Sequence, residues 1–143
     1  VRPLKHELRL IMWKYCGVLK NETLLLEGLS KIEQIRSKLN DIDIRIDRYN
    51  CEDLALIFDL QSSLLSAKAT FISAIQREES RGAHQRSDYQ KIEPKCQFNC
   101  LVSMDENFNL KISKSPLKEL NQNLKKIIAN AKREEDIKDK LLE

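Results

Sequence analysis

The chain has 143 residues, which is enough for one ordinary domain with a modest core and too few for a comfortable second one. Its 25 Lys and Arg against 22 Asp and Glu leave a formal net charge of +3 spread over the whole chain, too balanced to indicate nucleic-acid binding. No apolar run approaches the roughly 20 residues of a membrane span, and no signal-peptide pattern opens the chain, so we expect a cytoplasmic protein without direct membrane insertion.

The first helix is predicted over residues 4–19, where apolar residues recur at steps of three and four and therefore share one helix face. Pro3 suits its first turn, because no backbone N–H is needed there. The chain opens on Val1 rather than Met, directly before this pattern, so we expect a fragment or a processed product. The apolar positions are Leu4, Leu8, Ile11, Met12, Tyr15 and Leu19.

Two longer helices are predicted over residues 22–48 and from Asn50 to Gly82. Asn21 and Asn50 are the candidate N-caps, since an Asn side chain accepts a backbone N–H at a helix start, and Gly82 is expected to end the third helix. The break between the helices is short enough for an antiparallel hairpin, which favours an intramolecular bundle over a homo-oligomeric coiled coil. We predict a mainly α protein with an antiparallel three-helix bundle, similar to a spectrin repeat, over residues 1–90.

After Pro94 the apolar period changes from helical to alternating, which predicts a β-hairpin within residues 91–115. Residues 105–107 are turn-forming and separate the two strands. Because a lone hairpin is marginally stable, its apolar face should rest on the bundle or on a partner. Residues 116–143 are predicted to form a C-terminal amphipathic helix or charged tail, with apolar positions at Leu117, Leu120, Leu124, Ile127, Ile128 and Ala131.

Four cysteines without a secretory segment indicate reduced thiols rather than a disulfide framework. Cys96 and Cys100 could form half of a zinc site with His84, but zinc sites more often place two residues between the cysteines and need a fourth ligand. We expect no metal site, and we interpret Cys96 and Cys100 as strand residues. The other two cysteines are Cys16 and Cys51.

Catalytic patterns are equally sparse. No local arrangement provides a Cys–His nucleophile pair with an oxyanion donor, and three isolated glycines cannot form a phosphate-binding loop. Paired carboxylates such as Glu78 and Glu79 point about 100° apart on a helix, which is typical of a solvated face. We therefore expect no catalytic and no cofactor-binding residue in this chain.

The densest polar stretch follows the third helix and contains Arg81, His84 and Arg86. One interpretation is contact with an anion or a dicarboxylate, because Arg offers a planar fork to carboxylates and His exchanges a proton near neutral pH. The residues by themselves favour a helix end, where cations complement the helix dipole, Gly82 forms a left-handed turn and Asp88 pairs with an Arg.

This stretch, "ESRGAHQRSDY" at residues 79–89, resembles a segment near the C-terminus of succinate dehydrogenase and fumarate reductase flavoprotein subunits, with a similar variant in L-aspartate oxidases. The resemblance covers about residues 4–113. Ahead of the motif, "LRLIMWKYCGVLKNETLLLEGLSKIEQI" resembles the L-aspartate oxidase branch and "LQSSLLSAKATFISAIQREESRGAH" resembles the family's long helix. Behind it, "CLVSMDENFNLKIS" resembles the hairpin of the dehydrogenase and reductase branch, with Cys100 where the family often has His.

The resemblance implies the C-terminal helical domain of an FAD-dependent oxidoreductase, a bundle that packs against the FAD-binding domain of its own chain. FAD and the catalytic residues would belong to the preceding domains, an iron–sulfur subunit is a candidate partner, and the complex could be peripheral to a membrane. The expected interface residues are Glu79, Ser80, Arg81, Gly82, His84, Arg86 and Asp88. The alternative hypothesis is a free-standing helical protein-interaction module.

Overall fold

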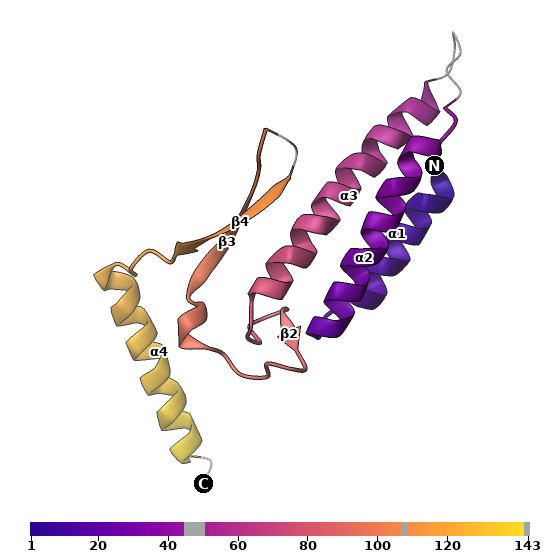
Figure 1. The fold of residues 1–143 in the computed structure, drawn as a ribbon. Coiled ribbons are helices and arrows are strands. Elements are labelled where there is room, and N and C mark those ends of the chain that lie inside the picture. Colours follow the sequence, from indigo (N-terminus) through magenta and orange to yellow (C-terminus); the bar gives the residue numbers. More distant parts are fainter. Residues whose placement is uncertain (45–50, 107–108, 142–143) are drawn as a thin grey trace.

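The computed structural model describes residues 1–44, 51–106 and 109–141, with side chains described as far as residue 131. Figure 1 shows three helices side by side, a two-stranded hairpin next to the third, and a fourth helix that extends away from the others. Within the described residues no helix is both long and apolar enough to cross a membrane. The helices are α1 (Arg2–Tyr15), α2 (Glu22–Lys38), α3 (Glu52–Gln76) and α4 (Gln122–Leu141), with 3-10 turns at Leu39–Asp41 and Pro94–Cys96. The strands are β1 (Leu19–Lys20), β2 (Gln85–Arg86), β3 (Phe98–Met104) and β4 (Leu110–Pro116).

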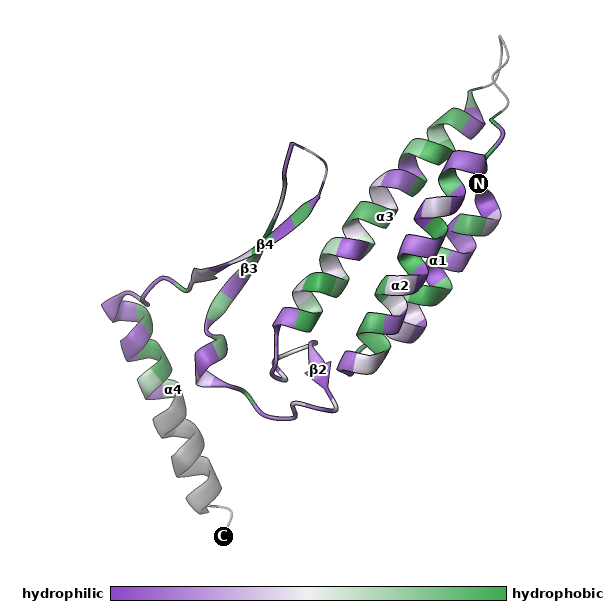
Figure 2. Ribbon diagram, in the orientation of Figure 1, coloured by the Kyte–Doolittle hydropathy of each residue, from purple (hydrophilic) through white to green (hydrophobic). Residues whose placement is uncertain are grey.

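The core lies between α1, α2 and α3, each antiparallel to the helix before it in the chain, so the predicted mainly α three-helix bundle is confirmed. Apolar residues recur along each of these helices, and polar residues separate them (Figure 2). Their burial in a common interior is the main source of stability for such a bundle. The buried core residues are Leu8, Ile11, Tyr15, Leu25, Ile32, Ile35, Leu60, Leu64, Ala67, Phe71 and Ala74.

Gly28 lies where the three helices approach most tightly. A Cβ atom at this position would stand 2.5 Å from two ring carbons of Phe71 and 2.6 Å from Cβ of Tyr15. Both distances are too short for a carbon contact, so the hydrogen of glycine is what allows α1 and α3 to close on α2 here.

Two of the predicted helix starts are confirmed. Pro3 occupies the first turn of α1. The Asn21 side chain accepts a hydrogen bond from Leu24 N at 2.8 Å, which satisfies one of the unpaired N–H groups at the start of α2. Asn50 lies outside the described residues, and the N-cap position of α3 is Cys51, without a side-chain cap bond.

The predicted helix ends were wrong. α1 stops at Tyr15 rather than at residue 19, because Leu19 and Lys20 leave the helix and pair in parallel with Gln85 and Arg86. α2 stops at Lys38 and gives way to a 3-10 turn containing Asn and Asp, residues whose side chains compete for backbone hydrogen bonds. The predicted continuation through residues 45–48 lies outside the described residues.

α3 ends at Gln76 and not at Gly82. Arg77 already has an extended backbone (φ −95°, ψ 94°). Its side chain reaches the carbonyl oxygens of Cys96 at 3.1 Å and Phe98 at 2.5 Å. These long-range hydrogen bonds hold the chain away from the helical path, and nothing in the local sequence encodes them.

The hairpin forms as predicted, with β3 antiparallel to β4 and Val102 opposite Ile112. Its turn is closed by a bond from Asp105 N to Asn109 O at 3.0 Å, and the intervening residue 107 lies outside the description. Both strands contact α3, as the marginal stability of a lone hairpin required. Phe98 is buried, whereas Cys96, predicted to be a strand residue, lies in the preceding 3-10 turn.

α4 begins at Gln122, six residues after residue 116, where the predicted C-terminal helix or tail began. Asn121 sets this start, because its side chain accepts a hydrogen bond from Leu124 N at 2.8 Å. As far as residue 131, the large apolar side chains of this region are exposed, and they are Leu117, Leu120, Leu124, Ile127 and Ile128.

Candidate functional site

The candidate site is the loop that follows α3 and carries the "ESRGAHQRSDY" stretch. Arg81 N donates to His84 O at 2.8 Å, and His84 N donates to Arg81 O at 3.0 Å, which closes a tight turn. Gly82 has a φ of +56° in this turn, the left-handed region that favours glycine, so the predicted left-handed turn is confirmed although no helix ends there.

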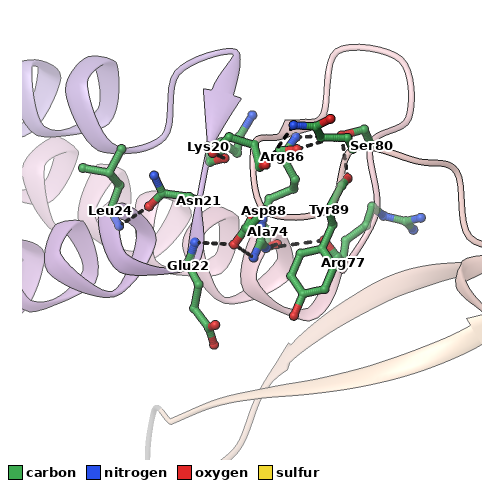
Figure 3. Close-up of polar contacts among 12 residues, drawn as sticks. Lys20, Asn21, Glu22, Leu24, Ala74, Arg77, Ser80, Arg86, Asp88 and Tyr89 are labelled. Carbon is green, nitrogen blue, oxygen red and sulfur yellow. Dashed lines mark hydrogen bonds and ion pairs between the residues drawn. The ribbon is translucent and has the colours of Figure 1, made fainter.

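Arg86 lies beneath this turn and is only 2% exposed. Its Nε and Nη2 each donate to one oxygen of Asp88 at 2.7 Å, so the predicted pairing of Asp88 with an Arg is confirmed. Its Nη1 donates to Ala74 O at 3.0 Å and thereby satisfies a carbonyl in the last turn of α3 (Figure 3). The guanidinium also lies 4.9 Å from the centre of the Tyr89 ring, a cation–π distance.

Asp88 connects this arginine to the beginning of α2. Its second oxygen accepts a hydrogen bond from Glu22 N at 2.8 Å (Figure 3). The hydrogen bond from Arg86, together with that from the helix N-terminus, lowers the pKa of Asp88 to about 2. The pair therefore ties the N-terminus of α2 to the C-terminus of α3.

Glu79, which the sequence placed on a solvated helix face, is instead buried, with 0% exposure. Arg81 donates to both of its oxygens, from Nε at 2.9 Å and from Nη2 at 3.0 Å, and Arg77 Nη1 donates at 2.5 Å. The N–H of Glu93 adds a fourth bond at 3.1 Å. The bond from Arg81, assisted by the others, outweighs burial and lowers the pKa of Glu79 to about 2.

Ser80 and His84 fill the space between these two ion pairs. Ser80 Oγ accepts from Arg86 N and donates to Tyr89 O, both at 2.8 Å. His84 Nε2 lies 3.1 Å from Arg77 O, which can only accept, so this nitrogen carries the proton. Burial, reinforced by the positive charges of Lys20, Arg86 and Arg77, lowers the pKa of His84 and favours the neutral ring.

The structure thus brings all seven predicted site residues into one network and gives most of them internal partners. Buried side-chain nitrogen and oxygen atoms all have hydrogen-bond partners in the part of the chain that is described. Over the same residues, no group of three or more His, Cys, Asp or Glu side chains could hold a metal ion, and the four cysteines are free thiols. The arrangement can order a loop and join secondary structure elements, and it presents no nucleophile beside a base.

Several residues of this network escaped sequence reasoning. Arg77 and Glu22 precede the motif in helical patterns, and their contacts depend on where the loop returns. Lys20 could have been noticed as a charged residue in an otherwise apolar stretch after Gly17. It pairs through its backbone in β1, with Lys20 O accepting from Ser87 N at 2.8 Å.

Comparison with known proteins now places the chain in a family. The family model described as fumarate reductase flavoprotein C-term matches residues 5–132, which extends beyond residue 113, where the sequence resemblance ended. An uncharacterized FAD-dependent oxidoreductase of Methanocaldococcus jannaschii is 31% identical over 102 residues, covering 71% of this chain and 18% of the relative. An L-aspartate oxidase of Pyrococcus horikoshii is 37% identical over 82 residues, covering 57% of this chain and 13% of the relative.

A solved structure supports the same fold. The chain superimposes on Escherichia coli quinol fumarate reductase with a TM-score of 0.74 and 23% identity, covering 84% of this chain and 21% of that one. The chain spans less than a fifth of the length of the two curated relatives. The chain is also similar to part of an L-aspartate oxidase. Because the family model matches most of its length, the chain belongs to the fumarate reductase flavoprotein C-terminal family.

Proposed function

We propose that this chain is the non-catalytic C-terminal helical part of a longer FAD-dependent oxidoreductase and packs against the FAD-binding domain of that protein. The parent enzyme would interconvert succinate and fumarate or oxidise L-aspartate, with FAD held outside this chain. The proposed organisation is a bundle over residues 1–90, a hairpin extension over 91–115 and a C-terminal helix over 116–143, all in one domain.

One observation carries this proposal beyond family membership. The charged groups that first suggested a reactive centre are engaged in the fold, since Glu79 holds Arg77 and Arg81 while Asp88 holds Arg86. A residue that must bind or protonate a substrate needs a hydrogen-bonding group that is not already engaged within the protein and that can reach the substrate. A structural role for this loop therefore accounts better for its chemistry than catalysis does.

We further propose that the loop contributes to the interface with the FAD-binding domain. Gly82 is exposed and the Arg81 side chain is 40% exposed, so this tip can reach a neighbouring domain. Glu79, Ser80, Arg86 and Asp88 would act from beneath by fixing the shape of the loop. An iron–sulfur subunit is a candidate further partner, in a cytoplasmic complex peripheral to a membrane.

Flavin titration tests the division of labour. The 143-residue chain is titrated with FAD while flavin fluorescence is followed. The proposed longer protein, of which this chain would be the C-terminal part, is purified and its visible spectrum is recorded. We expect no saturable binding by the chain alone and a flavin spectrum in the longer protein. Stoichiometric, flavin-specific binding by the chain would contradict the proposal.

The role of the loop is tested by Arg81→Ala in the longer protein, with the exposed Arg36→Ala as a matched control on α2. Loss of the exposed guanidinium should weaken flavin retention or domain assembly, measured by released flavin after gel filtration. Normal assembly with abolished turnover would instead indicate that Arg81 takes part in the chemistry directly.

The alternative function, a free-standing interaction module, is favoured by one observation. Five large apolar side chains between Leu117 and Ile128 are exposed together and offer a surface for a partner. The coding sequence upstream distinguishes the two proposals. A Gly-rich βαβ segment there supports the flavoprotein, and a start codon next to Val1 supports the module.

A further inference from the structure

A groove of about 950 Å³ runs between α1 and α3 and ends at Ala83 in the motif loop. Its floor is formed by small residues of α3, among them Ser62, Ser66 and Thr70. Each of these hydroxyls donates to the carbonyl four residues earlier, at 2.8–3.0 Å, so their hydrogens need no acceptor from an occupant of the groove. The groove can therefore accept an apolar surface closely.

The wall of the groove carries two large apolar residues that face solvent in this chain. Trp13 on α1 is 84% exposed, and Val18 in the connection to β1 is 69% exposed. Leu19, next to Val18, is also exposed. Exposed apolar groups gathered along one hollowed face are typical of a surface that is covered by a partner.

Among the described residues, two cations that line the groove form no ion pair, and of these Arg9 is exposed whereas Lys20 is buried. Lys20 is only 8% exposed, yet in the described part of the chain its ammonium bonds only to Val18 O, at 3.2 Å, and forms no ion pair with a carboxylate. Asp59 is the one acid among the described residues that line the groove, and it pairs with Lys5. Lys20 also lines a smaller cleft with Arg77 and His84, and the described lining of that cleft contains no acid.

A charged lysine with so little exposed surface is costly unless a negative charge compensates it. Glu79 and Asp88 are not available to pair with Lys20, because each already accepts several hydrogen bonds from arginines and backbone N–H groups. A compensating carboxylate would therefore come from a segment outside this chain. The apolar part of that segment could pack in the groove while its carboxylate pairs with Lys20.

We propose that the groove between α1 and α3 is the face that docks on the FAD-binding part of the longer protein, and that it receives an apolar segment with a carboxylate that pairs with Lys20. This inference rests on the proposed function and adds the docking face and the chemistry of the docked segment. The carboxylate of such a segment would complement the charge of Lys20, and its apolar part would cover Trp13 and Val18.

The docking face is tested by oxidative footprinting with mass spectrometry on the 143-residue chain and on the flavin-loaded longer protein. Trp13, the only tryptophan of the chain, should be oxidised at least tenfold more slowly in the longer protein. The half-exposed Leu26 on α2, away from the groove, serves as the internal control and should react equally in both. Equal reactivity of Trp13 in a flavin-loaded longer protein would overturn the inference and leave the proposed function intact. A longer protein without flavin would overturn the proposed function, and with it this inference.

The ionic anchor is tested by Lys20→Met, with the exposed Lys14→Met of α1 as the matched control. In the 143-residue chain, Lys20→Met should leave the thermal midpoint unchanged or raise it, because a buried unpaired ammonium is removed. In the longer protein the same change should lower the midpoint and speed flavin release, because a carboxylate loses its partner. An equal decrease in both proteins would place the role of Lys20 inside the bundle and overturn the anchor.

Discussion

At the scale of single residues, Glu79 has the most unusual electrostatic environment in the motif loop. Its carboxylate is buried and accepts hydrogen bonds from Arg77, Arg81 and the backbone of Glu93. The charged form is therefore the form that stabilises the fold. The charged form of Asp88, which is less buried, is likewise held by Arg86 and by the backbone N–H of Glu22.

Acid pH should destabilise the protein through these two carboxylates. The pKa of Glu79 falls from its ordinary 4.5 to about 2 on folding, so its contribution is fully present above pH 4.5 and is lost as the pH drops toward 2. Asp88 adds a similar loss from its ordinary value of 3.8 downward. Urea unfolding between pH 7 and 2.5 should show this decline.

The substitution Glu79→Gln should lower the free energy of unfolding at pH 7 by about 2 kcal/mol, because hydrogen bonds to a charged acceptor are lost. It should also flatten the decline below pH 4.5. The neighbouring Glu78→Gln is the control, since Glu78 is exposed and should keep the pH dependence of the unmodified chain. Parallel curves for Glu79→Gln and the unmodified chain would contradict the assignment.

Gly28 allows close helix packing because it has no side chain. In Gly28→Ala the new methyl group would collide with Phe71 and Tyr15, which costs about 1–3 kcal/mol, whereas the better helix propensity of alanine returns about 1 kcal/mol. We expect a net loss of up to about 2 kcal/mol in urea unfolding. Ser30→Ala on the exposed side of the same helix should change stability by less than about 0.5 kcal/mol.

At the scale of elements, the starts of α2 and α4 offer a matched pair of N-caps. Asn21 and Asn121 each accept the N–H three residues ahead at 2.8 Å, but only α2 is part of the buried core. Asn21→Ala should therefore destabilise the bundle by about 1 kcal/mol in urea unfolding. Asn121→Ala should lower the helical circular dichroism slightly and leave the unfolding midpoint of the bundle unchanged. A loss of bundle stability in both variants would mean that α4 is coupled to the core.

Helix existence and helix ends followed different rules in this chain. Apolar spacing of three and four predicted all three bundle helices, because this periodicity is a local property of the sequence. The ends at Tyr15 and Gln76 depended on contacts with distant segments, such as the strand pairing of Lys20 with Arg86. Where the end is set by a local cap, as at Asn21, the sequence was sufficient.

At the scale of the whole molecule, Arg77 joins the bundle to the hairpin. It extends from the end of α3 to the carbonyl oxygens of Cys96 and Phe98, and its guanidinium lies 5.0 Å from the centre of the Phe98 ring. The hairpin is therefore fixed to α3 by one arginine in addition to the contact of its strands with that helix.

Arg77→Ala should release the hairpin without unfolding the bundle. Since a charge-assisted hydrogen bond contributes about 1.5–3 kcal/mol, the amides of β3 and β4 should exchange roughly tenfold faster or more. Hydrogen exchange measured by mass spectrometry should find the core of α1, α2 and α3 still protected. The exposed Arg36→Ala on α2 is the control, and equally fast exchange of hairpin and bundle in Arg77→Ala would show that the two unfold together.

The sequence by itself determined the three-helix core, the hairpin and the family of the chain, because apolar periodicity and a dense motif are readable from neighbouring residues. Apart from the pairing of Asp88 with an arginine, only the tertiary structure decided what the charged residues of the motif contact. Arg86 can hold Asp88, the end of α3 and the ring of Tyr89 only because the loop turns back at Gly82 beneath the helix. It also left Lys20 buried without an acid, since the burial of a charge depends on which segments the fold places around it.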